Sequence, residues 1–135
     1  MKVNNLKLKI LGTNPQSIDR AENRYKFSKL LDKLGIAQPS WQEAASIEEA
    51  KKFAKKVGYP VLARPSYVLS GEAFTVVFRE NELESYLKRA SRITSDYPVV
   101  ISKFLRNAKE IEFDAVAKKG KILIGIISEH IELAG

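Results

Sequence analysis

The sequence predicts a mixed α+β fold in which helices alternate with strands. Apolar residues recur with a helical period in three segments, and short runs rich in β-branched residues lie between those segments. A third observation is a hairpin pattern near the C-terminus, where two alternating segments flank Lys118-Lys119-Gly120. This order favours packed layers of helix and sheet over a helix bundle or a β-sandwich.

The first half of the chain contains clear start and stop signals for helices. Ser17 is a suitable N-cap, Gly35 a suitable C-terminal stop, and Ser46 to Glu49 matches a capping box. The expected elements are a strand at 6–11, a helix from Ile18 to Leu34 with a candidate break near Asn23, a short edge strand or extended link at 36–41, and a helix capped by Ser46 that stops at Gly58.

The second half alternates in the same way and ends in the hairpin. Asn81 is the expected N-cap of a third amphipathic helix, which Tyr97-Pro98 closes. The expected strands are 61–63, 73–78, a buried strand at 99–101, and the two hairpin strands at 110–117 and 121–130.

Composition restricts the classes of function. The 135 residues suffice for one domain, and 44% hydrophobic with 29% charged residues is typical of a globular protein. The absence of cysteine excludes disulfides, thiolate metal sites and cysteine nucleophiles, and it is consistent with a reducing compartment. The formal charge of +7 comes from basic residues that mostly alternate with Glu on expected helices, which argues against a nucleic-acid surface. No apolar run is long enough to predict a membrane span, and the charged start does not resemble a signal peptide.

The segment 59–78 carries the most chemical information. It reads as a strand, then Arg64, then a loop of small and hydroxyl-bearing residues at 66–71, then a second strand. A cation at the end of a strand beneath a loop suits a polyphosphate. A plain hairpin with a surface arginine is the alternative that spacing alone leaves open.

Three further groups of residues could take part in binding. Arg20 and Arg24 are four residues apart, which predicts one helical face, either as a second phosphate contact or as a solvated pair beside Asp19 and Glu22. Segment 99–105 resembles a strand that runs into a linker, whose backbone could meet a planar base.

The acids and the one histidine near the C-terminus are the third group. Glu110, Glu112 and Asp114 alternate with apolar residues and share one strand face, which is either solvated or directed at a ribose or a metal. His130 beside Glu129 is more typical of a structural or surface pair than of a metal ligand, and the sequence has no second histidine to complete a zinc site. Neither the P-loop pattern nor G-x-G-x-x-G is present.

Several motifs, taken in order, resemble the large subunit of carbamoyl-phosphate synthetase. They are Ile10-Leu-Gly-Thr-Asn-Pro, Ile18-Asp-Arg-Ala-Glu-Asn-Arg, Gly58-Tyr-Pro, Arg64-Pro-Ser-Tyr-Val-Leu-Ser-Gly, Ile101-Ser-Lys-Phe-Leu and Ser128-Glu-His-Ile-Glu. The Arg64 motif resembles the second, carbamate-phosphorylating half of that subunit. Ser70-Gly71 and Ser102-Lys103-Phe104 resemble the eukaryotic type. Segments 19–24 and 99–104 resemble the multifunctional pyrimidine-pathway enzyme more than the urea-cycle one.

The resemblance implies the N-terminal part of an ATP-grasp domain, truncated before the metal-binding lobe is complete. Residues 1–27 would end a preceding region and linking helix, and 28–135 would begin the ATP-grasp domain. Within it, the small lobe would cover about 38–98 and the second lobe would start at 99–135. The family's metal ligands lie further on, so the resemblance implies that this chain alone does not catalyse, although its parent is an ATP-dependent ligase.

The resemblance also implies roles for individual residues. Arg24 and Arg64 would contact the phosphates of ATP, with Arg64 also catalytic. The loop at Ser70 and Gly71 would close over them. Lys103 and Leu105 would hold the adenine through backbone groups, Glu110 would bind the ribose hydroxyls, and Gly135 would begin a further nucleotide-binding loop.

Partners and location follow from the same resemblance. The substrates would be ATP, with Mg²⁺, and carbamate; the partners would be the rest of the synthetase and a glutamine amidotransferase domain, with no nucleic acid and no membrane. The location would be cytoplasmic, or mitochondrial for a urea-cycle type. Two alternatives remain: another ATP-grasp ligase related to biotin carboxylase, against which the run from Arg64 to Gly71 argues, and a basic module that binds RNA or a protein.

Overall fold

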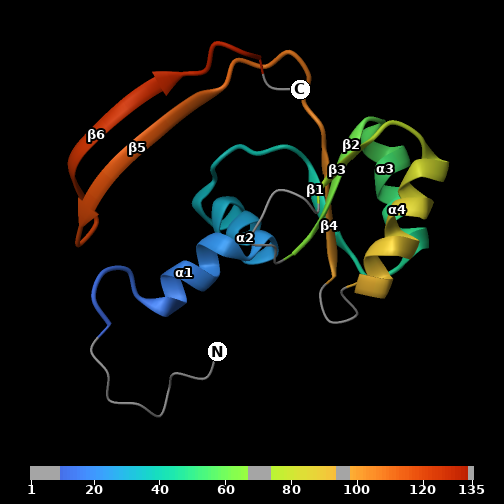
Figure 1. Cartoon of the computed structure of the whole chain (residues 1–135), viewed down its shortest axis with the longest axis horizontal. Helices are drawn as coiled ribbons and strands as arrows, with labels where there is room; N and C mark the ends of the chain where they lie inside the picture. The colour runs from blue at the N-terminus through green and yellow to red at the C-terminus, as the bar shows by residue number, and fades with distance from the viewer. Residues whose placement is uncertain (1–9, 67–73, 94–97, 134–135) are drawn as a thin grey trace. The chain divides into compact units, whose positions relative to one another are not determined.

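A computed structural model of the chain describes residues 10–66, 74–93 and 98–133. The chain divides into two compact units, Met1–Lys103 and Phe104–Gly135. The first unit combines helices with a four-stranded sheet, and the second contains a two-stranded hairpin. The expected mixed α+β fold is therefore confirmed (Figure 1).

The first unit alternates helices and strands along the chain. Its elements are α1 (Pro15–Glu22), α2 (Arg24–Leu34), β1 (Trp41–Ala44), α3 (Ile47–Val57), β2 (Val61–Pro65), β3 (Thr75–Val77), α4 (Glu80–Ile93) and β4 (Val99–Lys103). The strand order in the sheet is β1-β4-β2-β3, and all neighbouring strands are antiparallel. Both β4 and β2 are therefore internal strands.

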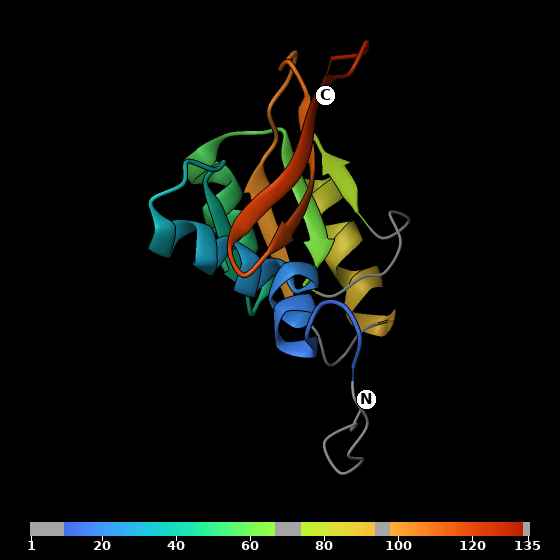
Figure 2. The ribbon, with the colours of Figure 1, turned by 90° about the vertical axis from the view of Figure 1, so that its left-hand side faces the viewer.

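The two faces of this sheet are covered by different helices. Helices α3 and α4 pack on one face, while α2 contacts the other through Tyr25, whose ring lies edge-on to Trp41 with 5.8 Å between centroids. Figure 2 shows α1 and α2 in front of the sheet with α3 and α4 behind it. Within the described part of this unit, the extensive apolar core lies on the α3–α4 face.

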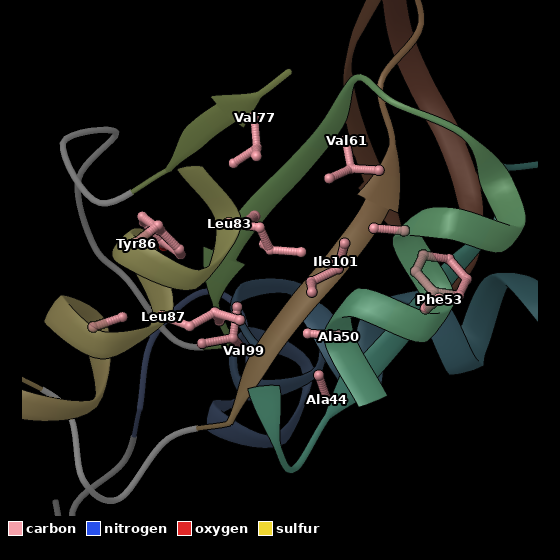
Figure 3. Packing of buried hydrophobic residues seen from close by; sticks show 13 residues of the cluster. Ala44, Ala50, Phe53, Val61, Val77, Leu83, Tyr86, Leu87, Val99 and Ile101 are labelled. Carbon is pink, nitrogen blue, oxygen red and sulfur yellow. The ribbon is translucent and has the colours of Figure 1, made fainter. Parts of the chain in front are cut away.

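That core is built from residues at helical spacing and at alternate strand positions. Leu83 of α4, Val61 of β2 and Ile101 of β4 are fully buried, and Figure 3 shows their side chains meeting between the sheet and the two helices. The other members of the buried cluster are Ala44, Ala50, Phe53, Ala54, Ala63, Val77, Tyr86, Leu87, Ala90 and Val99. Burying a leucine or isoleucine side chain stabilises a fold by about 1.5–3 kcal/mol.

Four helix boundaries expected from the sequence are confirmed. Gly35 is the C-cap that ends α2, and Gly58 is the C-cap that ends α3. The helical pattern breaks at Asn23, whose side chain accepts a hydrogen bond from the Lys26 amide (3.0 Å) and so begins α2. The Ser46 hydroxyl caps α3 by accepting from the Glu49 amide (3.1 Å). The Glu49 carboxylate accepts in return from the amide of Ala45 (3.0 Å), one residue earlier than in the standard capping box.

Three expected boundaries are wrong. Helix α1 begins at Pro15 with Asn14 as its N-cap, so Ser17 lies inside the helix. Of the two alternatives for 36–41, residues 36–40 form no strand, which agrees with an extended link, and the edge strand lies at Trp41–Ala44, paired with β4. Helix α4 starts at Glu80, so Asn81 lies within it. Strand β2 continues through Arg64 to Pro65, so Arg64 lies in the strand and not beyond its end.

The remaining expected strands of this unit were placed only approximately. Most of the strand expected at 6–11 lies outside the described residues, and Ile10 and Leu11 belong to no strand. The strand expected at 73–78 is confined to Thr75–Val77 within the described part of that segment. The buried strand expected at 99–101 is confirmed and extends to Lys103.

The second unit is the hairpin of β5 (Ile111–Lys118) and β6 (Lys121–Glu129). Lys119 and Gly120 connect the strands with positive φ angles of 51° and 76°, as the expected tight turn requires. Gly125 lies beneath the ring of Phe113, which a Cβ atom at position 125 would approach to 2.5 Å. Every side chain of both strands is exposed in this structure.

Candidate functional site

Arg64 lies on the sheet face opposite the apolar core. Paired residues in neighbouring strands point to the same face, and successive residues alternate. Arg64 pairs with Val100 of β4, which in turn pairs with Glu43 of β1, so Glu43 and Arg64 flank Val100 on one face. Trp41 belongs to this same face, and it contacts α2.

The environment of Arg64 disfavours its positive charge. The side chain is half-buried, and its Nε atom is buried without a hydrogen-bond partner among the residues that the structure describes. Burial, followed by the nearby positive charge of Arg24, lowers the pKa of Arg64 to about 10. Among the described residues, neither arginine forms an ion pair with a carboxylate. Two neighbouring cations of which one is desolvated form a site suited to an anion.

A set of backbone contacts brings Arg24 close to Arg64. The amide of Arg24 at the start of α2 donates to the carbonyl of Ser66 (2.9 Å), just beyond β2. Ser66 is itself buried, and its amide and hydroxyl both donate to the carbonyl of Pro98, at 3.0 and 2.7 Å. The start of α2 is thereby fixed beside the end of β2.

The expectation that Arg20 and Arg24 share one helical face is wrong. The break at Asn23 puts Arg20 in the last turn of α1 and Arg24 at the start of α2. Asp19, which could have neutralised this pair, forms its ion pair with Lys26 instead. Of these two arginines, only Arg24 influences the pKa of Arg64.

The ammonium group of Lys103 does not lie on the sheet face that carries Arg64. It pairs with the buried Val61, so its side chain starts on the core side of the sheet. Its Nζ donates to the carbonyls of Gly58 (2.8 Å) and Tyr59 (3.3 Å). The expectation that Lys103 meets a nucleotide through its backbone, not its side chain, stays a prediction.

The other expected nucleotide contacts lie in the second unit or outside the described residues. Leu105 and Glu110 both belong to the second unit and are exposed. The carbonyl of Glu110 accepts from the amide of His130 (3.0 Å). Ser70, Gly71 and Gly135 lie outside the described residues, so their expected roles stay predictions.

A polar hollow that sequence reasoning missed lies between α2 and β1. It has a volume of about 340 Å³ and is lined by Tyr25, Lys29, Asp32, Trp41, Gln42 and Glu43. Lys29 Nζ lies 5.6 Å from the centre of the Tyr25 ring and 5.8 Å from that of Trp41. Trp41 and Glu43 are two residues apart, which in a strand puts both side chains on one face. This spacing could have indicated the hollow, but the sequence predicted the strand at 36–41.

Two acidic side chains of the hairpin, Glu112 and Glu129, each contact a basic side chain. His130 Nε2 lies 3.1 Å from a carboxylate oxygen of Glu112, and Lys109 forms an ion pair with Glu129 at 3.0 Å. The hydrogen bond with Glu112 and the charge of Glu110 raise the pKa of His130. Among the described residues, no group of three or more His, Cys, Asp and Glu side chains could hold a metal ion. His130 therefore belongs to a surface pair with an acid.

The chain has the α+β fold of the N-terminal part of an ATP-grasp domain. It is similar to the carboxyaminoimidazole ribonucleotide synthase of Aspergillus clavatus, solved in complex with ATP, with a TM-score of 0.72 and 20% identity over 87% of this chain and 30% of that one. At this level of identity the likeness establishes the fold alone. No described helix has the length and apolar character needed to cross a bilayer.

Sequence comparison establishes the family. The profile for the ATP-binding domain of the carbamoyl-phosphate synthase L chain matches residues 23–130. The multifunctional protein URA2 of Saccharomyces cerevisiae is 59% identical over 95% of this chain and 6% of that protein. The mitochondrial arginine-specific carbamoyl phosphate synthase large chain of Schizosaccharomyces pombe is 53% identical over 100% of this chain and 12% of that protein.

The chain therefore belongs to the carbamoyl-phosphate synthase large-chain family, in its ATP-binding domain. The resemblance noted from the sequence motifs is confirmed. The chain spans about 6–12% of the length of these two relatives.

Proposed function

We propose that this chain forms the nucleotide-binding part of a carbamoyl-phosphate synthase, in the half that transfers a phosphoryl group from ATP to carbamate. The observation that carries the proposal is the half-buried Arg64, whose charge is disfavoured by burial and by Arg24 and is not neutralised by any described carboxylate. A bound polyphosphate would supply the missing negative charge.

Phosphoryl transfer depends mainly on positioning the phosphates and on neutralising the charge that develops on them. In this proposal Arg24 and Arg64 contact the phosphates and the loop with Ser70 and Gly71 closes over them. The backbone at Lys103 and Leu105 receives the adenine. Glu110 binds the ribose hydroxyls, and Gly135 begins the next nucleotide-binding loop.

The spacing of these positions along the sheet supports a nucleotide. Lys103 pairs with Val61 at one end of the β2–β4 ladder, and Arg64 pairs with Val100 near the other end. At the strand rise of about 3.3 Å per residue, the two ends are roughly 10 Å apart. A base at one end would therefore place its phosphates near the arginines at the other.

The described residues do not fit a resident Mg²⁺. Magnesium requires several oxygen ligands in octahedral geometry, and the described ranges 10–66, 74–93 and 98–133 contain no group of three or more His, Cys, Asp and Glu side chains that could hold a metal ion. The charge neutralisation that this part of the chain contributes therefore comes from its two arginines. Any ligands for Mg²⁺ are proposed to lie elsewhere in the parent protein.

The remaining organisation is also proposed at the level of the parent. Residues 1–27 would belong to a preceding region, the small lobe would cover about 38–98, and 99–135 would be the start of the second lobe. The two compact units of the structure meet slightly later in the chain, after Lys103. The partners would be carbamate, the rest of the synthetase and an amidotransferase domain. The location would follow the parent, and one relative carries the name of a mitochondrial enzyme.

The test is a titration of the chain with a non-hydrolysable ATP analogue and, separately, with RNA. The proposal expects saturable binding of the analogue that Arg64→Ala weakens at least tenfold, while Arg20→Ala serves as the matched control. RNA binding at physiological salt with a steep salt dependence, unchanged by Arg64→Ala, would contradict the proposal and favour a basic interaction module.

A chain continued through the complete synthetase permits the test of activity. We expect it to form ATP from ADP and carbamoyl phosphate, and Arg64→Ala to reduce that rate by at least a hundredfold. Full activity of the variant would remove Arg64 from the mechanism.

A further inference from the structure

Lys103 occupies the point at which the chain leaves the first unit. It is the last residue of β4 and of that unit, and Phe104 begins the second. Three hydrogen bonds hold it in place. Its amide donates to the carbonyl of Ser40 (2.8 Å), and its ammonium donates to the carbonyls of Gly58 (2.8 Å) and Tyr59 (3.3 Å).

The two carbonyls that receive the ammonium lie just beyond the C-terminus of α3. Gly58 is the C-cap of this helix, and its amide donates to the carbonyl of Ala54 (2.9 Å). The C-terminal end of a helix carries partial negative charge and unpaired carbonyls, so a cation is stabilised there. The ammonium of Lys103 is thus directed at α3 from a neighbouring strand.

The register of the sheet keeps this ammonium away from the arginine site. Lys103 shares its face with Val61 and Ile101, both fully buried toward α3 and α4, whereas Arg64 starts on the opposite face. The Lys103 side chain therefore starts on the core side, and its ammonium already donates to two carbonyls. It is not directed at phosphates near Arg64.

We propose that Lys103 is a positioning residue whose ammonium ties the exit of the chain from the first unit to the end of α3, and thereby fixes the backbone of Phe104 and Leu105. The functional consequence rests on the proposed function, in which that backbone receives the adenine. Lys103 would then affect ATP binding through the placement of the following backbone, without a contact between its side chain and the nucleotide.

Two substitutions separate anchoring from other roles. Lys103→Met keeps the length of the side chain but removes its donors, leaving two carbonyls unpaired. Lys103→Arg retains donors that can reach both carbonyls. Lys55→Met is the matched control, because Lys55 is exposed and forms a surface ion pair with Glu80 (2.9 Å).

The first measurement is hydrogen exchange of this chain without nucleotide. Lys103→Met should raise exchange at least tenfold in the peptides that cover 58–62 and 103–106, and Lys103→Arg should restore most of the protection. Lys55→Met should leave these peptides unchanged. If Lys103→Met also leaves them unchanged, the ammonium is not an anchor and the proposal is overturned.

The second measurement is steady-state kinetics of the complete synthetase. Lys103→Met should raise KM for ATP about fivefold or more with kcat within twofold, since adenine contacts contribute equally to the ground and transition states. Lys103→Arg should restore KM. A KM that rises equally in Lys103→Arg would show that the lysine contacts the nucleotide directly, and it would overturn the proposal.

The kinetic result also separates this inference from the proposed function. If Arg64→Ala abolishes activity while Lys103→Met leaves KM for ATP unchanged, the anchoring role in ATP binding is wrong and the proposed function stands. If neither variant changes ATP binding or turnover, the nucleotide site itself is wrong, and hydrogen exchange alone decides whether Lys103 anchors the chain.

Discussion

The two units of this chain are stabilised in different ways. The first buries an apolar cluster between one sheet face and two helices, with Leu83, Val61 and Ile101 fully inaccessible to solvent. The second is a hairpin in which isoleucines remain exposed by 60% or more, among them Ile126 at 65% and Ile127 at 72%. Most of the stabilisation by apolar burial therefore lies in the first unit. A two-stranded hairpin is only marginally stable by itself.

Truncation of matched apolar residues tests this difference most strongly. Leu83→Ala should reduce the free energy of unfolding by about 2–5 kcal/mol, because it leaves a cavity in the packed cluster. Ile126→Ala and Ile127→Ala should change it by less than about 0.5 kcal/mol, since exposed side chains lose little. Urea unfolding followed by circular dichroism provides the measurement. Equal losses at Leu83 and Ile126 would show that the hairpin is packed in solution.

The first unit also contains an arrangement that reduces its stability. Burial, followed by the charge of Arg24, lowers the pKa of Arg64 in the folded state to about 10, so folding disfavours the charged form of this side chain at neutral pH. Arg64→Met should therefore stabilise the chain by about 1 kcal/mol, a value reduced for the partial exposure of the side chain. Thermal unfolding of Arg64→Met, with Arg20→Met as the exposed control, measures this effect.

A stabilising substitution at Arg64 that also abolishes binding of the ATP analogue would be the expected signature of a binding site. Functional cations are often retained at the expense of stability. Destabilisation by Arg64→Met would instead indicate that the arginine has a structural partner in solution.

The local features that sequence reasoning identified are those that neighbouring residues determine. Asn23 breaks the helix because its own side chain accepts from an amide three residues later, and Ser46 begins α3 in the same way. Lys119 and Gly120 adopt positive φ in a tight turn. Each of these features depends on residues that are close in sequence, so the amino-acid sequence alone is enough to predict it.

The features that were missed depend on pairing between distant strands. Trp41–Ala44 contains no β-branched residue and forms a strand because it pairs with β4. Glu43 and Arg64 lie on the same sheet face because each of them pairs with Val100 of β4, the strand between them. The direction of the Lys103 side chain follows from its pairing with Val61. A shift of one residue in register would reverse each of these faces, and the sequence alone does not determine that register.

Ion pairs between helices offer a smaller test within the first unit. Hydrogen bonds from Lys51 and then Lys88 lower the pKa of Glu84 to about 2, and Lys51 joins α3 to α4 through this carboxylate. A depressed carboxylate pKa contributes stability above the unfolded pKa of about 4.5, and the contribution is lost as the pH falls toward about 2. Glu84→Gln should therefore flatten the fall in thermal stability over this interval.

The matched control is Glu22→Gln on α1. It should leave the acid dependence of the unfolding temperature as in the original chain. If Glu84→Gln shows the same acid dependence as the control, the contact between α3 and α4 does not depend on this carboxylate.

The smallest expected effect lies in the second unit, where His130 faces Glu112 across the hairpin. The hydrogen bond with Glu112 raises the pKa of His130, so this pair stabilises the strand pairing at pH below the unfolded value of about 6.5. The contribution is lost as the pH rises through the folded pKa.

Because the chain has one histidine, its ring protons give a single titration curve by NMR. Glu112→Gln should lower the titration midpoint, and Glu132→Gln should leave it unchanged. An equal midpoint in Glu112→Gln would mean that β5 and β6 do not hold these side chains together in solution. The hairpin would then differ from the first unit in its order as well as in its lack of a core.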